Sequence, residues 1–501
     1  MATSTPLALV IGLGASGMAA ARFLAHTGWR LRLADTRAAP PALEERLAEL
    51  RVAQPDTEFA GSALLPDLLE GATLLVLSPG LSPTQSAAAA LVAEARVRGV
   101  PVVGEIELFA RELTRLAAFR GYVPRVLGVT GTNGKTTTTA LLGKMIAASG
   151  RSVAVAGNIG PSALDELRTR LRDNRLPEVW VLELSSFQLA TTTSLACDAA
   201  TVLNLTQDHL DWHGDMDAYA AAKARIFAAR TVQILNRDDA RVAAMARKDG
   251  AAITFGTGRP QHGNELGLAE EGGLAWLAWA EDLSPPGRKR KAAAELPGLP
   301  AEIHLHLLMP AEALKLRGRH NALNTLAALA LARAIGCPLA PLLNVAAEFR
   351  GEPHRVQFVA QVDGVDYIDD SKGTNVGATV AAIEGLAAEG RRLVLILGGE
   401  GKGQDFAPLA VPLQRAARGA VLIGRDAPAI ATVLGGAHYP VECAGSLEEA
   451  VAVAARLAQA GDAVLLSPAC ASLDMFRDYA HRAQVFVTAV QDIAMEAGQP
   501  C

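Results

Sequence analysis

The segment with the clearest chemical purpose is TGTNGKTT, residues 130–137, which follows an apolar run and precedes a helix-like segment. Amides of a glycine-rich turn at a helix start can cradle phosphates, and Lys135 can reach the β- and γ-phosphates as a point charge. Thr136 can offer its hydroxyl to Mg²⁺. The usual spacing puts a glycine at position 129, but Val129 stands there and the glycine is Gly128. We therefore predict a variant phosphate loop.

Further polar groups follow the next predicted strands. Glu183 ends the strand VWVLEL, and His209 lies in QDHLDWHG, residues 207–214, after the strand TVLNL. Because carboxyl ends of parallel strands meet at one sheet edge, Glu183 is placed to hold Mg²⁺ directly or through water. One member of the second cluster is expected to bind metal or phosphate. Lys223, on the helix just downstream, has the pattern of an ordinary surface lysine.

A second glycine-rich turn lies near the N-terminus. GLGASG, residues 12–17, follows a strand-like run and precedes a helix-like one, as in a dinucleotide fingerprint. Small residues there let a diphosphate approach backbone N–H groups. Asp35 ends the next strand, where a carboxylate could bind a ribose or a base. By itself the pattern also fits an NAD-dependent enzyme or a tight turn that binds nothing.

In the C-terminal third, four polar motifs each follow a predicted strand or adjoin one: PHR, DDSKGTN, GGEGKGQDF and LSPACASLDMF. Each has a plausible loop interpretation on its own. Together they predict a second substrate pocket facing the nucleotide site, since strand ends gather at one crevice. The guanidinium of Arg355 suits a γ-phosphate or its transition state.

Parallel sheets must position these motifs, because strands and helices alternate along most of the chain. We predict an α/β fold of three domains. These are a Rossmann-like domain (1–104), a central P-loop ATPase-like parallel sheet with a small antiparallel subsheet (105–351), and a C-terminal Rossmann-like domain (352–501). The Gly-, Pro- and charge-rich segment 257–300 is predicted to form loops and short antiparallel strands with an exposed basic tip at 288–291.

The composition argues against several classes of protein. A chain of 501 residues suggests two to four domains. A net charge of −5 and 4% aromatic residues argue against a nucleic-acid partner. The five cysteines contain no CxxC pair, which argues against a zinc site or a disulfide framework. No apolar run reaches the roughly 18 residues that span a bilayer, so we expect no membrane partner and a cytoplasmic location.

In this order the motifs resemble the Mur ligase family of peptidoglycan synthesis, over nearly the whole chain. GLGASG, GVTGTNGKTTT, GNIG, LELSSFQL, DHLD, AAKARIF, HNALN, PHR, DSKGTN, GGEGKG and LSPACASLDMF have family-like spacings. LELSSFQL with LSPACAS resembles the member that adds D-glutamate. The resemblance implies that the carboxylate of UDP-N-acetylmuramoyl-L-alanine attacks the γ-phosphate of ATP, and that the amine of D-glutamate captures the acyl phosphate. It also implies two Mg²⁺ ions and a monomer.

The resemblance further implies roles for single residues. Those toward the UDP substrate are Ala15, Ser16, Asp35, Thr36, Gly80 and Asn158. Those toward ATP are Gly131, Thr132, Asn133, Gly134, Lys135, Thr136, Thr137, Asn324, Arg355 and Asp370. Those supporting metal are Thr136, Glu183, His209 and a carbamylated Lys223. Those toward D-glutamate are Lys372, Thr374, Lys402, Ser472, Leu473 and Tyr479, the last standing where the family has phenylalanine. The implied catalytic residues are Lys135, His209, Lys223 and Arg355.

Other functions stay open at this point. Another Mur ligase or a folylpolyglutamate synthase-like ligase is the nearest alternative, although the folate enzymes should lack the N-terminal uridine domain. A dehydrogenase would leave the phosphate loop unexplained. A P-loop regulatory protein would have no need of the C-terminal lysine, serine and threonine set. His209 is a candidate to accept the amine proton, in competition with its role as a metal ligand.

Overall fold

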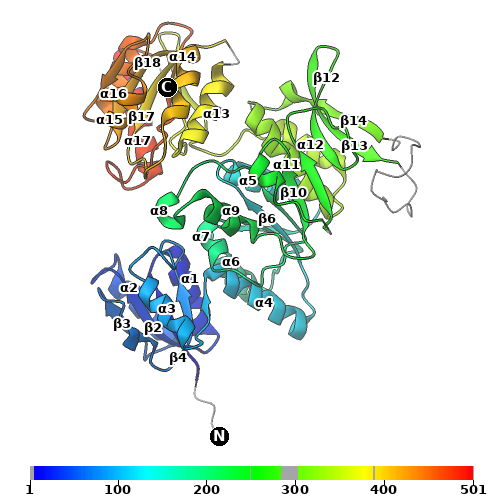
Figure 1. Cartoon of the computed structure of the whole chain (residues 1–501), viewed down its shortest axis with the longest axis vertical. Helices are drawn as coiled ribbons and strands as arrows, with labels where there is room; N and C mark the ends of the chain where they lie inside the picture. The colour runs from blue at the N-terminus through cyan, green and yellow to red at the C-terminus, as the bar shows by residue number, and fades with distance from the viewer. Residues whose placement is uncertain (1–4, 249, 284–302, 317, 388–389, 500–501) are drawn as a thin grey trace. The chain divides into compact units, whose positions relative to one another are not determined.

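The computed structural model describes residues 5–248, 250–283, 303–316, 318–387 and 390–499. They form three sheets, which follow one another along the chain (Figure 1). The predicted three-domain α/β fold is confirmed, while the boundaries at 104 and 351 stay predictions. The packing divides the chain into two compact units. An N-terminal unit comprises 1–205, 212–313 and 323–348, and a C-terminal unit comprises 206–211, 314–322 and 349–501.

The first sheet is fully parallel, in the order β3-β2-β1-β4-β5. Its strands are β1 Leu7–Ile11, β2 Arg30–Asp35, β3 Glu58–Gly61, β4 Ala72–Leu77 and β5 Val102–Val103, and its helices are α1 Ala15–His26, α2 Leu43–Ala53 and α3 Ala89–Val97. Every residue of β1 is buried, as expected of a strand covered on both faces. Val10 packs in one core with Met18 of α1, and Leu9 packs in another with Val92 of α3.

The second sheet has the order β14-β13-β12-β11-β10-β9-β6-β8-β7. Its strands are β6 Arg125–Thr130, β7 Val153–Gly157, β8 Val179–Glu183, β9 Ala199–Val202, β10 Val232–Asn236, β11 Ala252–Phe255, β12 Glu265–Glu271, β13 Leu274–Asp282 and β14 Ile303–Pro310. β12, β13 and β14 pair antiparallel, which confirms the predicted subsheet. The predicted basic tip at 288–291 lies outside the described residues.

The helices that accompany this sheet begin with α4 Glu105–Arg120 and α5 Lys135–Ala148. The others are α6 Ala163–Arg172, α7 Ser186–Ala190, α8 Leu210–His213, α9 Met216–Ala224, α10 Ala240–Ala243, α11 Arg319–Ala334 and α12 Leu339–Glu348. α5 starts directly after the glycine-rich turn that follows β6, so the predicted strand, turn and helix of the phosphate loop are confirmed.

The third sheet has the order β15-β16-β20-β17-β18-β19, with only β15 antiparallel among its described strands. Its strands are β15 Gln357–Val362, β16 Val365–Asp369, β17 Leu393–Gly398, β18 Ala417–Ile423, β19 Val441–Cys443 and β20 Ala463–Leu466. Its helices are α13 Val376–Ala387, α14 Ala410–Ala416, α15 Ala427–Val433, α16 Leu447–Leu457 and α17 Tyr479–Glu496. The polar motifs of this region follow β16, β17 and β20, which are neighbours in the sheet.

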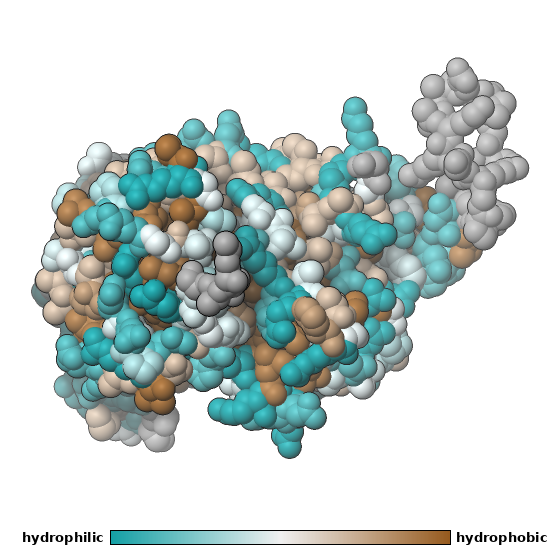
Figure 2. Space-filling model, turned by 90° about the horizontal axis from the view of Figure 1, so that it is seen from below, coloured by the Kyte–Doolittle hydropathy of each residue, from teal (hydrophilic) through white to brown (hydrophobic). Residues whose placement is uncertain are grey.

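Three further features concern the cysteines, the apolar character of the helices and the surface. The described cysteines Cys197, Cys337, Cys443 and Cys470 are free thiols. Within the described ranges, no helix combines the length and the apolar character needed to cross a membrane. On the face shown in Figure 2, hydrophobic residues are scattered among hydrophilic ones, and isolated surface hydrophobic residues need no partner to explain them.

Two glutamates on α4 make opposite contributions to stability. Glu105 is buried and accepts a hydrogen bond from the Leu164 N–H at 2.9 Å, and burial raises its pKa to about 7. Between the ordinary value of 4.5 and this raised pKa, the folded chain binds more protons than the unfolded one. The free energy of unfolding of the protein therefore falls as pH rises through that window. We expect Glu105→Gln to raise the free energy of unfolding above that window by about 2 kcal/mol.

Glu107 on the same helix is the matched control. Burial disfavours its charge, but the N–H groups of Thr193 and Ser194 donate to it at 2.8 and 2.9 Å, and these bonds lower its pKa. Glu107→Gln should therefore lower stability at neutral pH. Urea denaturation of both variants on either side of the window measures the effect. Equal behaviour of the two variants would contradict this account of Glu105.

Candidate functional site

The phosphate loop folds around its own lysine. Lys135 is the first residue of α5, and its Nζ donates to the Gly131 carbonyl at 2.9 Å and to the Thr132 carbonyl at 2.7 Å. The loop amides thus lie at a helix start, which favours anions. Gly134 has φ +81°, and a Cβ there would lie 2.4 Å from Asn324 Oδ1. The structure thereby brings the predicted ATP residue Asn324 directly against the loop.

Asn204, which follows β9, clamps the loop from the neighbouring strand. Its Oδ1 accepts the Asn133 N–H at 2.8 Å, and its Nδ2 donates to the Asn133 carbonyl at 3.1 Å. The Asn204 carbonyl also accepts the Thr132 N–H at 2.9 Å. Sequence reasoning missed this residue. The signal was available, since Asn204 follows a strand that pairs with the loop strand β6.

Lys223 is buried beneath the same loop, so its interpretation as a surface residue is wrong. Its side chain is 1% exposed, and its Nζ donates to the Gly131 carbonyl at 2.8 Å. It also lies 4.6 Å from the ring centre of Tyr219, one turn earlier on α9. The hydroxyl of Tyr219 lies 3.1 Å from Thr132 Oγ1. Tyr219 is a second residue that sequence reasoning missed, because a tyrosine on a helix gives no sign of its neighbours.

Lys135 and Lys223 share one acceptor, the Gly131 carbonyl. Two ammonium groups that meet at one carbonyl repel each other, and burial makes that repulsion stronger. A modification that turns one of them into an anion would remove the repulsion. The arrangement is therefore compatible with the carbamylated Lys223 that the family resemblance implies.

Glu183 supplies an unsatisfied carboxylate oxygen at the same sheet edge. It ends β8, pairs in register with Val129 of the loop strand, and is 1% exposed. Its Oε1 accepts the Asn158 Nδ2–H at 2.9 Å. Its Oε2 is buried without a hydrogen-bond partner among the described residues. An orphaned carboxylate oxygen of this kind fits an oxygen-seeking cation such as Mg²⁺.

A substitution tests the metal role of Glu183. Glu183→Gln keeps the shape of the side chain but removes its charge, so we expect the affinity for Mn²⁺ in the presence of ADP to fall about tenfold or more. Electron paramagnetic resonance of Mn²⁺ measures the free ion directly. Glu178, which is exposed just before the other end of β8, provides the control Glu178→Gln. Unchanged Mn²⁺ binding by Glu183→Gln would exclude it as a ligand.

His209 lies in the segment 206–211, which packs with the C-terminal unit. Its backbone has φ +56°, and its Nε2 lies 3.4 Å from Asp208 Oδ2. In the part of the chain that the structure describes, no three His, Cys, Asp or Glu side chains form a group that could hold a metal. The ligands that we expect for magnesium are of other types as well, since they include a threonine and a modified lysine. A metal shared by Glu183 and His209 stays a prediction.

A cavity of about 340 Å³ at the carboxyl edge of the first sheet gathers the predicted UDP residues. All five that belong to this sheet line it: Ala15, Ser16, Asp35, Thr36 and Gly80. The turn before α1 packs closely against the helix itself, because a Cβ at Gly17 would lie 1.9 Å from the Gly12 carbonyl oxygen. The cavity thus offers small residues and a helix start, the features that suit a diphosphate.

Asp35 lines this cavity and binds two of its neighbours, Leu13 and Arg37. Its Oδ2 accepts the Leu13 N–H at 2.8 Å, and Arg37 donates to both of its oxygens at 2.8 and 2.9 Å. Burial opposes the charge, but the bonds from Arg37 and Leu13 outweigh it and lower the pKa of Asp35 to about 2. The carboxylate therefore holds Arg37 at the cavity wall. Sequence reasoning missed Arg37, although it stands two residues after Asp35.

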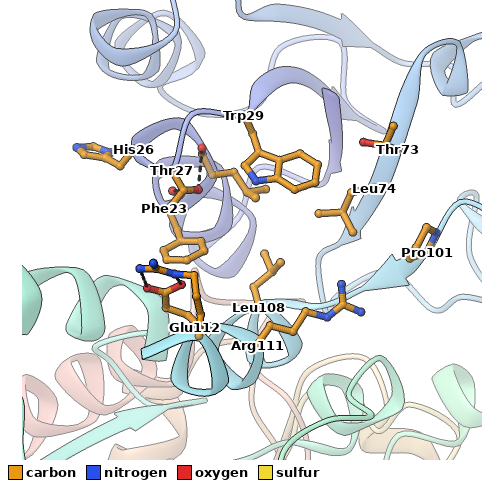
Figure 3. A pocket seen from close by; sticks show the side chains of 12 residues that line it. Phe23, His26, Thr27, Trp29, Thr73, Leu74, Pro101, Leu108, Arg111 and Glu112 are labelled. Atoms are coloured by element: carbon orange, nitrogen blue, oxygen red, sulfur yellow. Dashed lines mark hydrogen bonds and ion pairs between the residues drawn. The ribbon is translucent and has the colours of Figure 1, made fainter. Parts of the chain in front are cut away.

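Figure 3 shows a different, larger cavity of about 660 Å³ in the same unit. Phe23, Trp29 and Leu108 form its apolar wall, and a bidentate Arg115–Glu112 pair at 2.7 Å lies beside it. Thr73 and Leu74, near the start of β4, also line it. Parallel α/β sheets bind ligands at the opposite, carboxyl ends of their strands, and no predicted site residue lines this cavity. It is therefore not the candidate site.

In the C-terminal unit, the predicted D-glutamate residues lie at neighbouring strand ends. Lys372 and Thr374 follow β16, Lys402 follows β17, and Ser472 follows β20. Backbone bonds between Glu400 and Ala471 tie the β17 and β20 loops together. Tyr479, at the start of α17, faces Lys372, whose Nζ lies 3.5 Å from its ring centre. Leu473 is 64% exposed.

Asp370 is the most perturbed acid of this region. It is buried after β16, and Ser467 Oγ donates to its Oδ2 at 2.6 Å. Burial raises its pKa to about 7, although this hydrogen bond and the charge of Arg355 oppose the shift. A carboxyl poised near neutrality beside a guanidinium is typical of a functional site. The structure thus relates the predicted ATP residues Asp370 and Arg355 to each other.

Three family models match the chain in order. The Mur ligase MurD-like, N-terminal domain matches residues 7–104, the Mur ligase middle domain matches 129–332, and the Mur ligase, glutamate ligase domain matches 354–470. A UDP-N-acetylmuramoylalanine--D-glutamate ligase of Ralstonia nicotianae is 56% identical over 99% of this chain and 98% of its own. The ligase of that name from Burkholderia thailandensis is 57% identical over 98% of both chains.

Solved structures show the same fold at lower identity. UDP-N-acetylmuramate-alanine ligase from Thermotoga maritima matches with a TM-score of 0.56 and 20% identity, over 97% of this chain and 99% of its own. MurF ligase from Thermotoga maritima, solved in complex with ADP, matches with a TM-score of 0.58 and 17% identity, over 84% of this chain and 95% of its own.

Proposed function

Since this chain belongs to the Mur ligase family, we propose that it joins D-glutamate to UDP-N-acetylmuramoyl-L-alanine with consumption of ATP, in peptidoglycan precursor synthesis. The observation that carries the reaction type is the phosphate loop with two lysines at one carbonyl and Glu183 on the adjacent strand. The identity to D-glutamate ligases over the full length supports the choice of substrates.

The chemistry needs an activated carboxylate, because a carboxylate is a poor acyl donor. In the proposed reaction, the L-alanyl carboxylate attacks the γ-phosphorus of ATP, ADP leaves, and an acyl phosphate forms. The amine of D-glutamate then attacks the acyl carbon, the C–O bond to phosphate breaks, and the amine loses a proton. His209 is a candidate to accept that proton.

The residues of the phosphate loop hold ATP in this scheme. The loop amides and Lys135 bind the phosphates, Asn324 lies against the loop, and Arg355 with Asp370 contacts the nucleotide. The charges of Lys135 and Arg355 offset the charge that develops on the transferred phosphoryl group.

Magnesium is the expected metal. Thr136 and Glu183 would hold it, with Asn158 oriented by Glu183; His209 and a carbamylated Lys223 complete the set that we propose for two ions. When bound, Mg²⁺ would neutralise charge on the phosphate oxygens, which makes the γ-phosphorus easier to attack. The shared acceptor of Lys135 and Lys223 supports the carbamate.

The two remaining substrates occupy separate sheets. We assign the UDP group to the cavity lined by Ala15, Ser16 and Gly80, where the start of α1 suits a diphosphate and Arg37 is held at the wall by Asp35. D-Glutamate is assigned to the loops after β16, β17 and β20, whose lysines suit its two carboxylates. The domain boundaries at 104 and 351, the cytoplasmic location and the monomeric state belong to the same proposal.

Phosphate release identifies the substrates. With ATP, Mg²⁺ and UDP-N-acetylmuramoyl-L-alanine present, each candidate amino acid is added in turn, and D-glutamate is expected to be the one that gives sustained release. Parallel reactions with UDP-N-acetylmuramate plus L-alanine, and with a folate plus L-glutamate, represent the nearest alternatives. Release in either of those, with none in the presence of D-glutamate, would reject the proposed substrates.

A further inference from the structure

Arg482 is a fully buried arginine in the first turn of α17. This place is unfavourable for a cation, because the amino end of a helix carries partial positive charge. Burial lowers the pKa of Arg482 to about 10, so its guanidinium stays charged at neutral pH. A buried charge is costly unless its bonds compensate for it, so the groups that it binds indicate what it does.

The guanidinium binds backbone carbonyls of two different loops. Nη2 donates to the Ser371 carbonyl at 2.8 Å, and both Nη1 and Nη2 donate to the Cys470 carbonyl at 3.1 Å. Ser371 follows β16 and Cys470 follows β20, and these two strands pair in parallel. Arg482 thus fastens together two loops at the carboxyl ends of neighbouring strands.

These loops carry the side chains assigned to D-glutamate. Lys372 comes directly after Ser371, and Ser472 comes two residues after Cys470. The Ala469 N–H donates to the Gly373 carbonyl at 3.0 Å, so the loops also touch through their backbones. A shift of either bonded carbonyl would therefore move a side chain proposed to contact the substrate.

Arg482 also fixes the helix that carries Tyr479. The two residues are three positions apart on α17 and share a face of the helix. The ring of Tyr479 lies 3.5 Å from Lys372 Nζ and packs edge-on against His354. The bonds from Arg482 to Ser371 and Cys470 therefore hold the start of α17 against the loop that bears Lys372.

We propose that Arg482 is a positioning residue of the D-glutamate pocket, which sets the loops after β16 and β20 and the ring of Tyr479 at the spacing that a dicarboxylate amino acid requires. This inference rests on the proposed function. Without the guanidinium, two buried carbonyls lose their charged donor and the loops lose their common anchor. The UDP substrate and the ATP phosphates are assigned to other loops. Of the residues assigned to ATP, Asp370 adjoins Ser371, but its carboxyl accepts its hydrogen bond from Ser467 Oγ and not from Arg482, so ATP binding should change less than D-glutamate binding.

Steady-state kinetics of Arg482→Lys and Arg482→Gln test the proposal. A lysine keeps the charge but has no planar fork to reach two carbonyls. We expect the KM for D-glutamate to rise about tenfold or more in both variants, and the KM values for ATP and the UDP substrate to change less than about twofold. In Arg482→Ala, added methylguanidinium should lower the KM for D-glutamate again. Arg477→Gln, exposed just before α17, is the matched control.

Several results would overturn the proposal. An unchanged KM for D-glutamate in folded Arg482→Lys and Arg482→Gln would do so, as would an equal rise for all three substrates. Failure of both variants to fold would make Arg482 a residue of the fold instead. A wild-type protein that does not use D-glutamate would refute the proposed function itself, which the wild-type assay shows before any variant is compared.

Discussion

Lys135→Ala is expected to lower the rate of ADP formation by about 10³-fold or more, with folding unchanged. The side chain lies at the start of α5 and is held over the loop by the Gly131 and Thr132 carbonyls. No other lysine or arginine belongs to the loop itself, residues 130–137. Loss of its charge would leave the γ-phosphate without the cation of the loop during transfer, so that only Arg355 and Mg²⁺ would offset the developing charge. Rapid-quench measurement of ADP in a single turnover separates this step from product release.

Lys144→Ala is the matched control, because Lys144 lies on the same helix with an exposed side chain. We expect its rate to stay close to that of the wild type. A Lys135→Ala protein that forms ADP at the wild-type rate would remove the phosphate loop from the mechanism.

Lys223→Ala is expected to lose about 10²-fold or more of the activity and to regain part of it with added acetate or formate. The truncated side chain leaves space below the Gly131 carbonyl, where a small carboxylate can replace the anion of a carbamate. Steady-state phosphate release with and without the acid measures the rescue. In wild-type protein equilibrated with ¹³C-bicarbonate, a carbamate carbon signal should appear that the variant lacks.

Lys223→Arg separates charge from carbamylation. An arginine keeps a positive charge but forms no carbamate, and its side chain fills the space that an added acid would need. We therefore expect it to be inactive and not to be rescued. Full activity of Lys223→Ala without an added acid would dismiss the carbamate.

The positions of residues that follow strands could be predicted from the sequence. The glycine turn before α5 and Glu183 at the end of β8 were found because a buried apolar run and its polar end are local features. The cavity at the first sheet is lined by the UDP residues that the family resemblance implied. They come together because the carboxyl ends of parallel strands meet at one edge of the sheet.

Residues whose role depends on distant packing were not predicted from spacing. The helix AAAKARIF gives no indication that Lys223 lies under the phosphate loop, because the Gly131 carbonyl that it contacts there is 92 positions away in the sequence. Asp35 was expected to face a ribose or base, and the structure adds that both of its oxygens accept bonds from Leu13 and Arg37. Arg482 had no local signal at all, because its partners come from two other loops.

Isotope transfer tests the central claim most directly, namely that the terminal phosphoryl group of ATP passes to the substrate carboxylate before nitrogen attacks. UDP-N-acetylmuramoyl-L-alanine labelled with ¹⁸O in the alanyl carboxylate is converted with ATP and D-glutamate, and the phosphate is analysed by ³¹P NMR or mass spectrometry. We predict one ¹⁸O atom in each phosphate released. Product formation with unlabelled phosphate would contradict the account.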